Sequence, residues 1–218
     1  MDRFISFSGG VESTTMCVLY GKGAKAIFCD TGWEHEELYN RLDYVEQQLK
    51  VLHNGDFELI KIIPEVKLTS RITKEKVVVN KLQDYIKHYR FFPNQLARFC
   101  TREFKIQPID NFLKSKGECE LMIGLNVEEA EKREGNHEKI KSVKYSYPLV
   151  DDDLDRDDCI EILEKYGLNP NFPPYMSRGG CKGCFFKGKK EYRAMVHLSP
   201  KEIQEISDWI ENNSTEII

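Results

Sequence analysis

The chain has 218 residues, of which 40% are hydrophobic and 31% charged, a balance that suits one compact domain and argues against a disordered or disulfide-stapled chain. Its longest apolar runs are far shorter than the roughly 18 residues that a membrane helix requires, and its first residues lack a signal-peptide pattern. We therefore expect a cytoplasmic protein with no membrane partner, whose seven cysteines stay reduced.

The formal net charge of −4 conceals an uneven distribution of charge along the chain. Residues 61–105 contain eleven Lys or Arg against four Asp or Glu, and residues 178–193 contain six against one. Acidic residues concentrate in 32–46 and 151–164. Clustered cations indicate a surface that binds a polyphosphate, a nucleotide or a nucleic-acid backbone, whereas any single Lys is better explained as solvated surface.

Short β-like segments alternate with segments of helical period along most of the chain. The pattern predicts strands over 3–7, 24–30, 57–63 and 121–125, and helices over 11–20, 34–52, 81–89 and 106–113. Strands separated by helices imply an α/β fold with a parallel sheet covered by helices on both faces.

The C-terminal part of the sequence shows a loop and a final helix. Residues 168–190 are rich in Pro, Gly and Lys and are expected to form a long, irregular, functional loop. After it, Ser199, Pro200 and Glu202 combine an N-cap, a first-turn Pro and a capping-box Glu. We therefore expect a last helix that begins near residue 200.

The segment Ser8-Gly9-Gly10-Val11-Glu12-Ser13-Thr14 lies between the first predicted strand and the first predicted helix. Its two glycines let the backbone turn sharply and bring amide groups close to a ligand, and the hydroxyls of Ser8, Ser13 and Thr14 add donors. The helix that follows presents its positive end. The segment predicts a cradle for a phosphate, whereas a Gly-Gly pair alone would more often be only a turn.

This segment resembles the Ser-Gly-Gly-x-Asp-Ser signature of the PP-loop ATP pyrophosphatases. The matching residues are Ser8, Gly9, Gly10 and Ser13, and Glu12 stands where the signature has Asp. The resemblance implies an adenine nucleotide alpha hydrolase-like fold that binds ATP together with Mg²⁺. The Gly-Lys-Ser/Thr of a Walker loop is missing, so a kinase or GTPase of that type is excluded.

Four further segments are similar to the phosphoadenosine phosphosulfate reductase branch of that superfamily, and together the matches run from residue 4 to about 195. They are Cys29-Asp30-Thr31-Gly32, residues 124–133, Tyr147-Pro148-Leu149 and Gly167-Leu168-Asn169-Pro170. The resemblance implies that Asp30, Thr31, Gly32 and Gly124 belong to the nucleotide site. It also implies a single domain over 1–218, with a nucleotide-binding core over 1–150 and a C-terminal part over 151–218.

The same resemblance selects three cations for catalysis. Arg102, Lys105 and Arg133 are the residues expected to neutralise phosphate or sulfate, and a surface ion pair is the alternative for each. Within residues 124–133, Asn126 stands where the family has Arg, so one anion contact is missing, whereas Arg133 is retained.

The cysteines separate into packing residues and candidate ligands. Packing is expected for Cys17, Cys29, Cys119 and Cys159, which lie in apolar helices or beside strands, although Cys29 is close to the predicted nucleotide segment. Cys181 and Cys184 form a Cys-x-x-Cys pair in a basic, Gly-rich loop. Nearby Lys and Arg favour thiolates that share one soft metal centre, and a redox dithiol is the alternative.

In the resembling family, a cluster-binding branch carries tandem Cys-Cys before Lys-Val-x-Pro and a later Cys-x-x-Cys. Here Cys100 occupies the first Cys position and Thr101 the second, with Lys105 and Pro108 in register. The resemblance thus implies that Cys100, Cys181 and Cys184 hold a four-iron, four-sulfur (4Fe-4S) cluster with one iron open. Zinc with a fourth ligand other than Cys, conceivably His197, is the main alternative.

The predicted function depends on the absence of a C-terminal cysteine. Sulfonucleotide reductases of this family attack their substrate with a Cys in a C-terminal Glu-Cys-Gly-x-His motif, and the 34 residues after Cys184 contain no Cys, which disfavours simple reduction. The resemblance implies instead an ATP-dependent enzyme that releases AMP and pyrophosphate and transfers sulfur, assisted by its cluster, to tRNA, DNA or a nucleotide. A sulfur or electron donor protein would be its partner.

Two alternatives stay open at this point. One is an adenylyl sulfate reductase that takes its thiol from Cys29 or from a partner, and the other is a noncatalytic adenine-nucleotide sensor with a structural metal. The leading hypothesis requires the cradle at residues 8–14 to lie within reach of the three thiols.

Overall fold

The computed structural model describes residues 1–69, 74–133, 140–177 and 180–217, without the side chains of 131–133 and 214–217. The chain groups into two compact units, each built from several segments. Unit 1 comprises Met1–Phe28, Leu38–Ile62 and Ile109–Asn171, and unit 2 comprises Cys29–Glu37, Ile63–Pro108 and Phe172–Ile218. The expected division at residue 150 stays a prediction.

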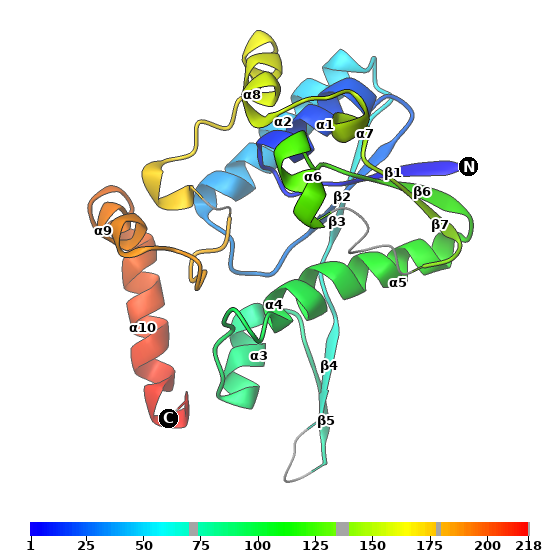
Figure 1. Cartoon of the computed structure of the whole chain (residues 1–218). Coiled ribbons are helices and arrows are strands. Elements are labelled where there is room, and N and C mark those ends of the chain that lie inside the picture. Colours follow the sequence, from blue (N-terminus) through cyan, green and yellow to red (C-terminus); the bar gives the residue numbers. More distant parts are fainter. Residues whose placement is uncertain (70–73, 134–139, 178–179, 218) are drawn as a thin grey trace. The chain divides into compact units, whose positions relative to one another are not determined.

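A five-stranded sheet carries unit 1 (Figure 1). Its strands, in spatial order, are β3 (Glu58–Ile62), β2 (Lys25–Cys29), β1 (Asp2–Ser6), β6 (Cys119–Ile123) and β7 (Val143–Ser146). Strand β1 pairs in parallel with β2 and with β6, and β6 pairs in parallel with β7. The predicted α/β class with a parallel sheet is therefore confirmed.

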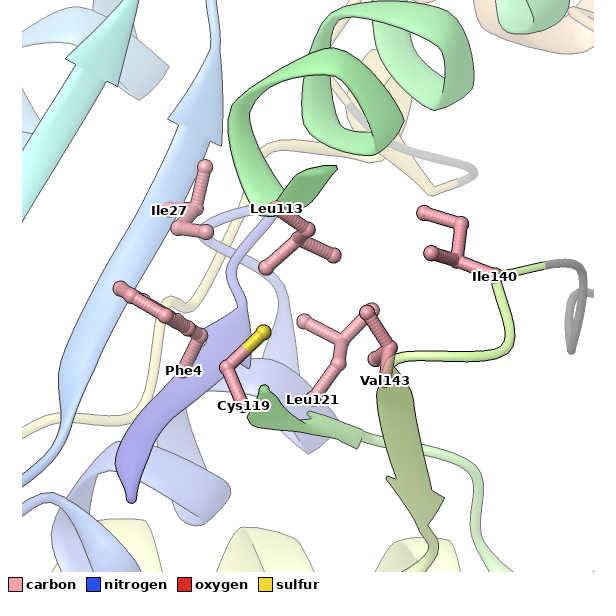
Figure 2. Close-up of a cluster of buried hydrophobic side chains, with 7 residues drawn as sticks. All are labelled: Phe4, Ile27, Leu113, Cys119, Leu121, Ile140 and Val143. Carbon is pink, nitrogen blue, oxygen red and sulfur yellow. The ribbon is translucent and has the colours of Figure 1, made fainter. Parts of the chain in front are cut away.

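Both faces of this sheet are buried, because successive residues of a strand point to opposite faces. Phe4 and Ile5 are neighbours in β1 and are 1% and 0% exposed, and Leu121 and Met122 in β6 are likewise buried. On one face a cluster contains Phe4, Ile27, Leu113, Cys119, Leu121, Ile140 and Val143 (Figure 2). Apolar residues on both faces confirm the predicted covering by helices on either side.

The helices predicted over 11–20, 34–52 and 106–113 are found, whereas strand β7 and the helices over 127–133 and 148–151 were not predicted. Helix α1 (Val11–Tyr20) ends at Gly21 as expected, and α2 (Glu36–Leu52), whose first two residues belong to unit 2, buries the apolar stripe predicted for it. Helix α1 packs against α7 (Pro148–Asp151) and α8 (Arg156–Lys165), and α6 (Val127–Arg133) contacts α7. Helix α5 (Gln107–Lys116) supplies Leu113 to the cluster of Figure 2.

Unit 2 contains mostly helices and one hairpin. The antiparallel strands β4 (Val66–Thr69) and β5 (Lys76–Val79) were not predicted, because each has four residues and β5 has a single buried one. Helix α3 (Leu82–Tyr89) was predicted, whereas α9 (Lys189–Leu198) was not. Helix α10 (Pro200–Ile217) contacts both of them. None of the helices in the described ranges has both the length and the hydropathy needed to cross a bilayer.

One continuous helical stretch leads from unit 2 into α5. It begins with α4 (Phe99–Thr101) and continues through a π-helical turn, η1 (Arg102–Ile106), in which the Gln107 N–H donates to the Arg102 carbonyl. Aromatic rings fix α4 and η1 to α3, since Tyr85 stacks on Phe99 with 4.7 Å between ring centroids and meets Phe104 edge-on at 5.7 Å. A π turn of this kind frequently marks a functional site.

Leu113→Ala tests the packing of unit 1. Because Leu113 is fully buried in the cluster of Figure 2, we expect the substitution to lower the free energy of unfolding by about 2–5 kcal/mol through the cavity it leaves. Val51→Ala, on the exposed side of α2, is the control and should change it by less than about 0.5 kcal/mol. Urea unfolding followed by circular dichroism measures both, and equal effects would contradict the assigned core.

Candidate functional site

The turn at residues 8–14 has the backbone of an anion cradle. Gly9 adopts a φ of +76°, and a Cβ there would lie 2.5 Å from Cδ1 of Leu38, so both conformation and space require glycine. Gly10 is the N-cap of α1 and provides no capping side chain. The first amides of a helix have no intrahelical acceptor, so this turn offers N–H donors and the positive helix end to an anion.

The hydroxyls of the cradle divide into an exposed one and two that shape the turn. Ser8 is exposed, and its Oγ lies 3.1 Å from the Oγ of Ser13, which also accepts from the Ser8 N–H at 3.2 Å. Thr14 is fully buried and donates to the Gly10 carbonyl at 2.7 Å. Ser8 is therefore the hydroxyl best placed for a ligand, whereas Thr14 stabilises the turn.

Arg41, which the sequence analysis missed, fastens the cradle to a second loop. Its Nε donates to the Gly9 carbonyl at 3.2 Å and its guanidinium to the Leu168 carbonyl at 2.5 Å. Burial lowers the pKa of Arg41 to about 10, so the side chain stays charged at neutral pH. No local motif marks Arg41, because its acceptors come from distant parts of the sequence.

Two further predicted residues border the first turn of α1. A Cβ on Gly124, just after β6, would lie 3.2 Å from the Met16 side chain and 3.3 Å from the Glu12 backbone, so glycine permits this close approach. The Glu12 carboxylate forms an ion pair with Arg156. Asn126, where the family has Arg, accepts from the Glu129 N–H at 3.0 Å at the start of α6. The Arg133 side chain lies outside the described part.

The segment after β2 forms a tight turn within unit 2. The Asp30 carboxylate accepts from the Gly32 N–H at 2.8 Å, and Gly32 has a φ of +72°. A Cβ on Gly32 would lie 2.8 Å from Cγ of Lys81, so the turn packs closely against the start of α3. Thr31 is buried, and its hydroxyl donates to the Glu34 carboxylate at 2.8 Å. This hydrogen bond stabilises the turn.

The three cysteines predicted as ligands are also the three that are partly accessible. Cys100, Cys181 and Cys184 are of intermediate exposure, whereas Cys17, Cys29, Cys119 and Cys159 are buried, as expected for packing residues. All three lie in unit 2, and they are near enough to interact electrostatically. The structure thus brings together residues that stand more than 80 positions apart in the sequence.

An isolated antiparallel bridge between Glu34 and Cys181 positions the Cys-x-x-Cys loop. On either side of the bridge, the His35 N–H donates to the Gly180 carbonyl at 2.6 Å, and the Lys182 N–H donates to the Trp33 carbonyl at 3.0 Å. These bonds hold the loop against the segment that follows β2. Cys100, by contrast, is carried by α4, directly before the π turn.

The Trp33 indole, also missed in the sequence, covers the loop between the two cysteines. A Cβ on Gly183 would lie 2.6 Å from the Trp33 ring, so only glycine fits between Cys181 and Cys184 without displacing the indole. Trp33 is 6% exposed, and its ring lies 5.5 Å from that of Trp209 in α10.

Charged side chains surround the thiols. Burial raises the pKa of both Cys100 and Cys181, whereas Lys105 lowers it. Lys105 Nζ lies 3.4 Å from the buried carboxylate of Glu34, and Lys187, itself buried, interacts electrostatically with Cys181 and Cys184. Lys105 therefore acts in the predicted direction, but burial has the larger and opposite effect on the pKa of Cys100 and Cys181.

Two other predicted residues have surface positions, whereas Lys182, between the two cysteines, is largely buried. The Lys182 ammonium pairs with Glu205 at 2.7 Å and with Glu202 at 3.4 Å, and both partners lie in α10. The side chain of Arg102 is 70% exposed and pairs with its neighbour Glu103, which matches the surface ion-pair alternative. His197 is exposed in the last turn of α9.

Residues 2–145 match the phosphoadenosine phosphosulfate reductase domain. The chain belongs to this family. The family is one of nucleotide-binding sulfur-transfer and reductase domains within the PP-loop superfamily, which confirms the predicted resemblance. The chain is also similar to an uncharacterized 37.8 kDa protein in the gpa 5′ region of Escherichia phage 186, with 23% identity over 249 aligned positions that cover 95% of this chain and 74% of the phage protein.

The segment 33–37 is also anchored to α10, and this contact differs from the capping box predicted there. Glu202 accepts from Nδ1 of His35 at 2.5 Å and from the Glu36 N–H at 2.9 Å, while the Ser199 hydroxyl donates to it at 3.0 Å. Burial alone would raise the pKa of Glu202, but these hydrogen bonds lower it to about 2. The Glu202 carboxylate, predicted to cap its own helix, therefore bonds to His35, which lies 167 positions away in the sequence.

Glu202→Gln is expected to lower the stability of the protein at pH 7, because the ionised carboxylate is the form that the native hydrogen bonds favour. In the wild type this stabilisation is complete above the ordinary Glu pKa of 4.5 and is lost as the pH falls towards about 2. The difference between wild type and variant in urea unfolding should therefore shrink over this range. Glu205→Gln, at an exposed partner of Lys182, is the control, and a pH-independent difference for Glu202→Gln would contradict the assignment.

Proposed function

We propose that this protein is an ATP-dependent sulfur-transfer enzyme that holds an adenine nucleotide at residues 8–14 and an iron–sulfur cluster at three cysteines. The proposal depends on one observation: the seven cysteines fall into two groups that differ in exposure to solvent. Cys100, Cys181 and Cys184 are partly accessible neighbours in one unit, whereas the remaining four are buried. Partial exposure beside cations is typical of cysteines that react or bind metal, and full burial is typical of inert ones.

The cradle supports binding of the nucleotide phosphates. Gly10 leaves the start of α1 without a side-chain cap, and Ser8 adds an exposed hydroxyl. These donors would stabilise negative charge that develops on the phosphates when pyrophosphate leaves. Glu12 is the carboxylate of this segment and the residue that we assign to Mg²⁺, which requires its ion pair with Arg156 to open.

The number of thiols favours a cluster over a single zinc ion, because three thiolates can hold an iron–sulfur cluster, whereas a structural zinc site requires a fourth ligand. A 4Fe-4S cluster held by Cys100, Cys181 and Cys184 would keep one iron open and supply sulfide or electrons to an activated acceptor.

Basic residues of unit 2 support an anionic acceptor such as tRNA or DNA. Within unit 2, β4 and β5 carry Lys67 and Lys76 on exposed positions, and α3 is preceded by Lys81. Cations in such a cluster bind a phosphate backbone without regard to sequence. A sulfur or electron donor protein completes the proposed reaction.

The reductase alternative is weakened by the environment of Cys29. Its thiol is buried and donates to the Lys105 carbonyl at 3.6 Å, and burial raises its pKa to about 12. A thiol that remains protonated is a poor nucleophile. The three hypotheses differ in their products: AMP and pyrophosphate for sulfur transfer, sulfite from adenylyl sulfate for reduction, and none for a noncatalytic nucleotide sensor.

Gly10→Asp tests the cradle. We expect it to abolish ATP binding, because it places a carboxylate against the phosphates at the start of α1. Gly10→Ala is the matched control: a Cβ there meets only Ser8 Oγ, at 3.5 Å, so the fold should be retained and ATP affinity should fall far less. Isothermal titration with ATP and Mg²⁺ measures both, and unchanged affinity in Gly10→Asp would refute the cradle.

Cys181→Ala tests the cluster. Iron and labile sulfide, measured on protein purified without oxygen, should both fall to a small fraction of the wild-type content, because two thiols cannot retain the cluster. Cys119→Ala removes a thiol from the buried core of unit 1 and should leave both contents unchanged. Stoichiometric zinc without labile sulfide in the wild type would end the sulfur-transfer proposal in this form.

A further inference from the structure

A second group of candidate ligands lies in unit 2 and contains no cysteine. His35, Glu37 and Glu202 each offer a ligand atom, and these atoms lie within 4.8 Å of one another. His35 is 0% and Glu202 1% exposed. The three residues come from the segment after β2, the first turn of α2 and the first turn of α10.

Two polar atoms of this group are buried without a hydrogen-bond partner. They are Nε2 of His35 and Oε2 of Glu37. The other polar atom of each side chain is occupied, since His35 Nδ1 bonds to Glu202 and Glu37 Oε1 accepts from the hydroxyl of Tyr175. Leaving a buried donor or acceptor unpaired costs roughly 1–3 kcal/mol, and such groups are rare in native proteins. Two of them in one cluster indicate a shared ligand.

The hydrogen bond from His35 to Glu202 determines what that ligand can be. When Nδ1–H donates to the carboxylate and the imidazole is neutral, Nε2 presents a lone pair, which is the form that binds a metal. Histidine ligands of metal ions almost always donate their other N–H in this way, which fixes the ring and raises its basicity. Glu202 itself is held by the Glu36 N–H, Ser199 and Lys182.

The charges of the group accommodate a cation. Glu202 interacts with two ammonium groups: Lys182, 3.4 Å away, which also pairs with Glu205, and Lys187. The less buried Glu37 carboxylate accepts from the uncharged Tyr175 hydroxyl, so a bound cation would face this carboxylate. Imidazole nitrogen with carboxylate oxygen suits zinc, manganese, iron or cobalt, in contrast to the soft thiolate set.

We propose that His35 Nε2 and a Glu37 carboxylate oxygen bind a divalent transition-metal ion, with Glu202 as the positioning carboxylate behind the imidazole. The ion would link His35 to Glu37 within the segment 33–37, whose side chains already bond to Glu202 of α10 and to Tyr175 of η2 (Pro174–Met176). Since the His35 backbone bonds to Gly180, it would stabilise the strand-like segment beside Cys181. This site is structural and does not depend on the proposed sulfur transfer.

Cobalt is the probe that separates this site from the cysteines. Co²⁺ bound by thiolates gives intense sulfur-to-metal charge-transfer absorption, whereas Co²⁺ on nitrogen and oxygen ligands gives only weak visible bands. In the full chain with Cys100, Cys181 and Cys184 all changed to Ser, after removal of metals with a chelator, we expect one equivalent of Co²⁺ to bind with the weak bands alone. The wild type should show these bands together with the charge transfer.

In that triple-Ser chain, His35→Gln should weaken Co²⁺ binding by at least tenfold. Glu36→Gln is the matched control, because Glu36 is an adjacent but exposed carboxylate that pairs with Lys201, and it should leave binding unchanged. Absence of Co²⁺ binding in the triple-Ser chain, or equal affinity after His35→Gln, would overturn the site and leave a bound water as the shared partner.

Because His35 is fully buried, its variant can fail to fold, and circular dichroism will show whether it does. In that case Glu37→Gln decides, since its amide oxygen can still accept from Tyr175 while the second metal ligand is lost. A tenfold or greater loss of Co²⁺ affinity supports the site, and unchanged affinity overturns it.

Discussion

The cysteine site depends on the pairing of residues 33–35 with residues 180–182. The loop that carries Cys181 and Cys184 has little regular structure around it, and a loop without partners would not hold two thiols in one place. Two backbone hydrogen bonds flank the bridge at Glu34, and the Trp33 indole occupies the space above Gly183. Backbone pairing and one large aromatic side chain thus hold the Cys-x-x-Cys loop in a defined conformation.

The balance between burial and charge at the thiols has a consequence for metal binding. Burial keeps Cys100 and Cys181 protonated, and Lys105 only partly opposes it. A cationic centre must therefore displace protons when it binds, so that affinity falls as the pH is lowered. Lys105 and Lys187 then meet thiolates in place of thiols, and their charges stabilise the loaded state more than the empty one.

Local patterns were enough to predict four of the five strands of the sheet, the longer helices α1, α2, α3, α5 and α10, and the turn before α1, because each depends on neighbouring residues: alternation in β1, an apolar stripe in α2, two glycines before α1. Local patterns were not enough where a side chain bonds to a residue that is distant in the sequence. Arg41 bonds to a carbonyl 127 positions away, and no motif announces it. Glu202 has the spacing of a capping residue, yet His35 takes its carboxylate, because a buried imidazole gains more from a charged acceptor than an exposed helix end does.

The eight residues from Asp30 to Glu37 combine tasks that the sequence analysis treated separately. Their beginning forms the turn that we predict to border the nucleotide, their middle pairs with the Cys-x-x-Cys loop through Glu34, and their end supplies His35 and Glu37. A short segment with this many fixed contacts has little freedom to change at one position without moving the next. Each acidic side chain at the end of this segment has a partner. Glu34 forms an ion pair with Lys105, Glu36 forms one with Lys201, and Glu37 accepts a hydrogen bond from Tyr175. These acidic side chains are therefore engaged by partners within unit 2.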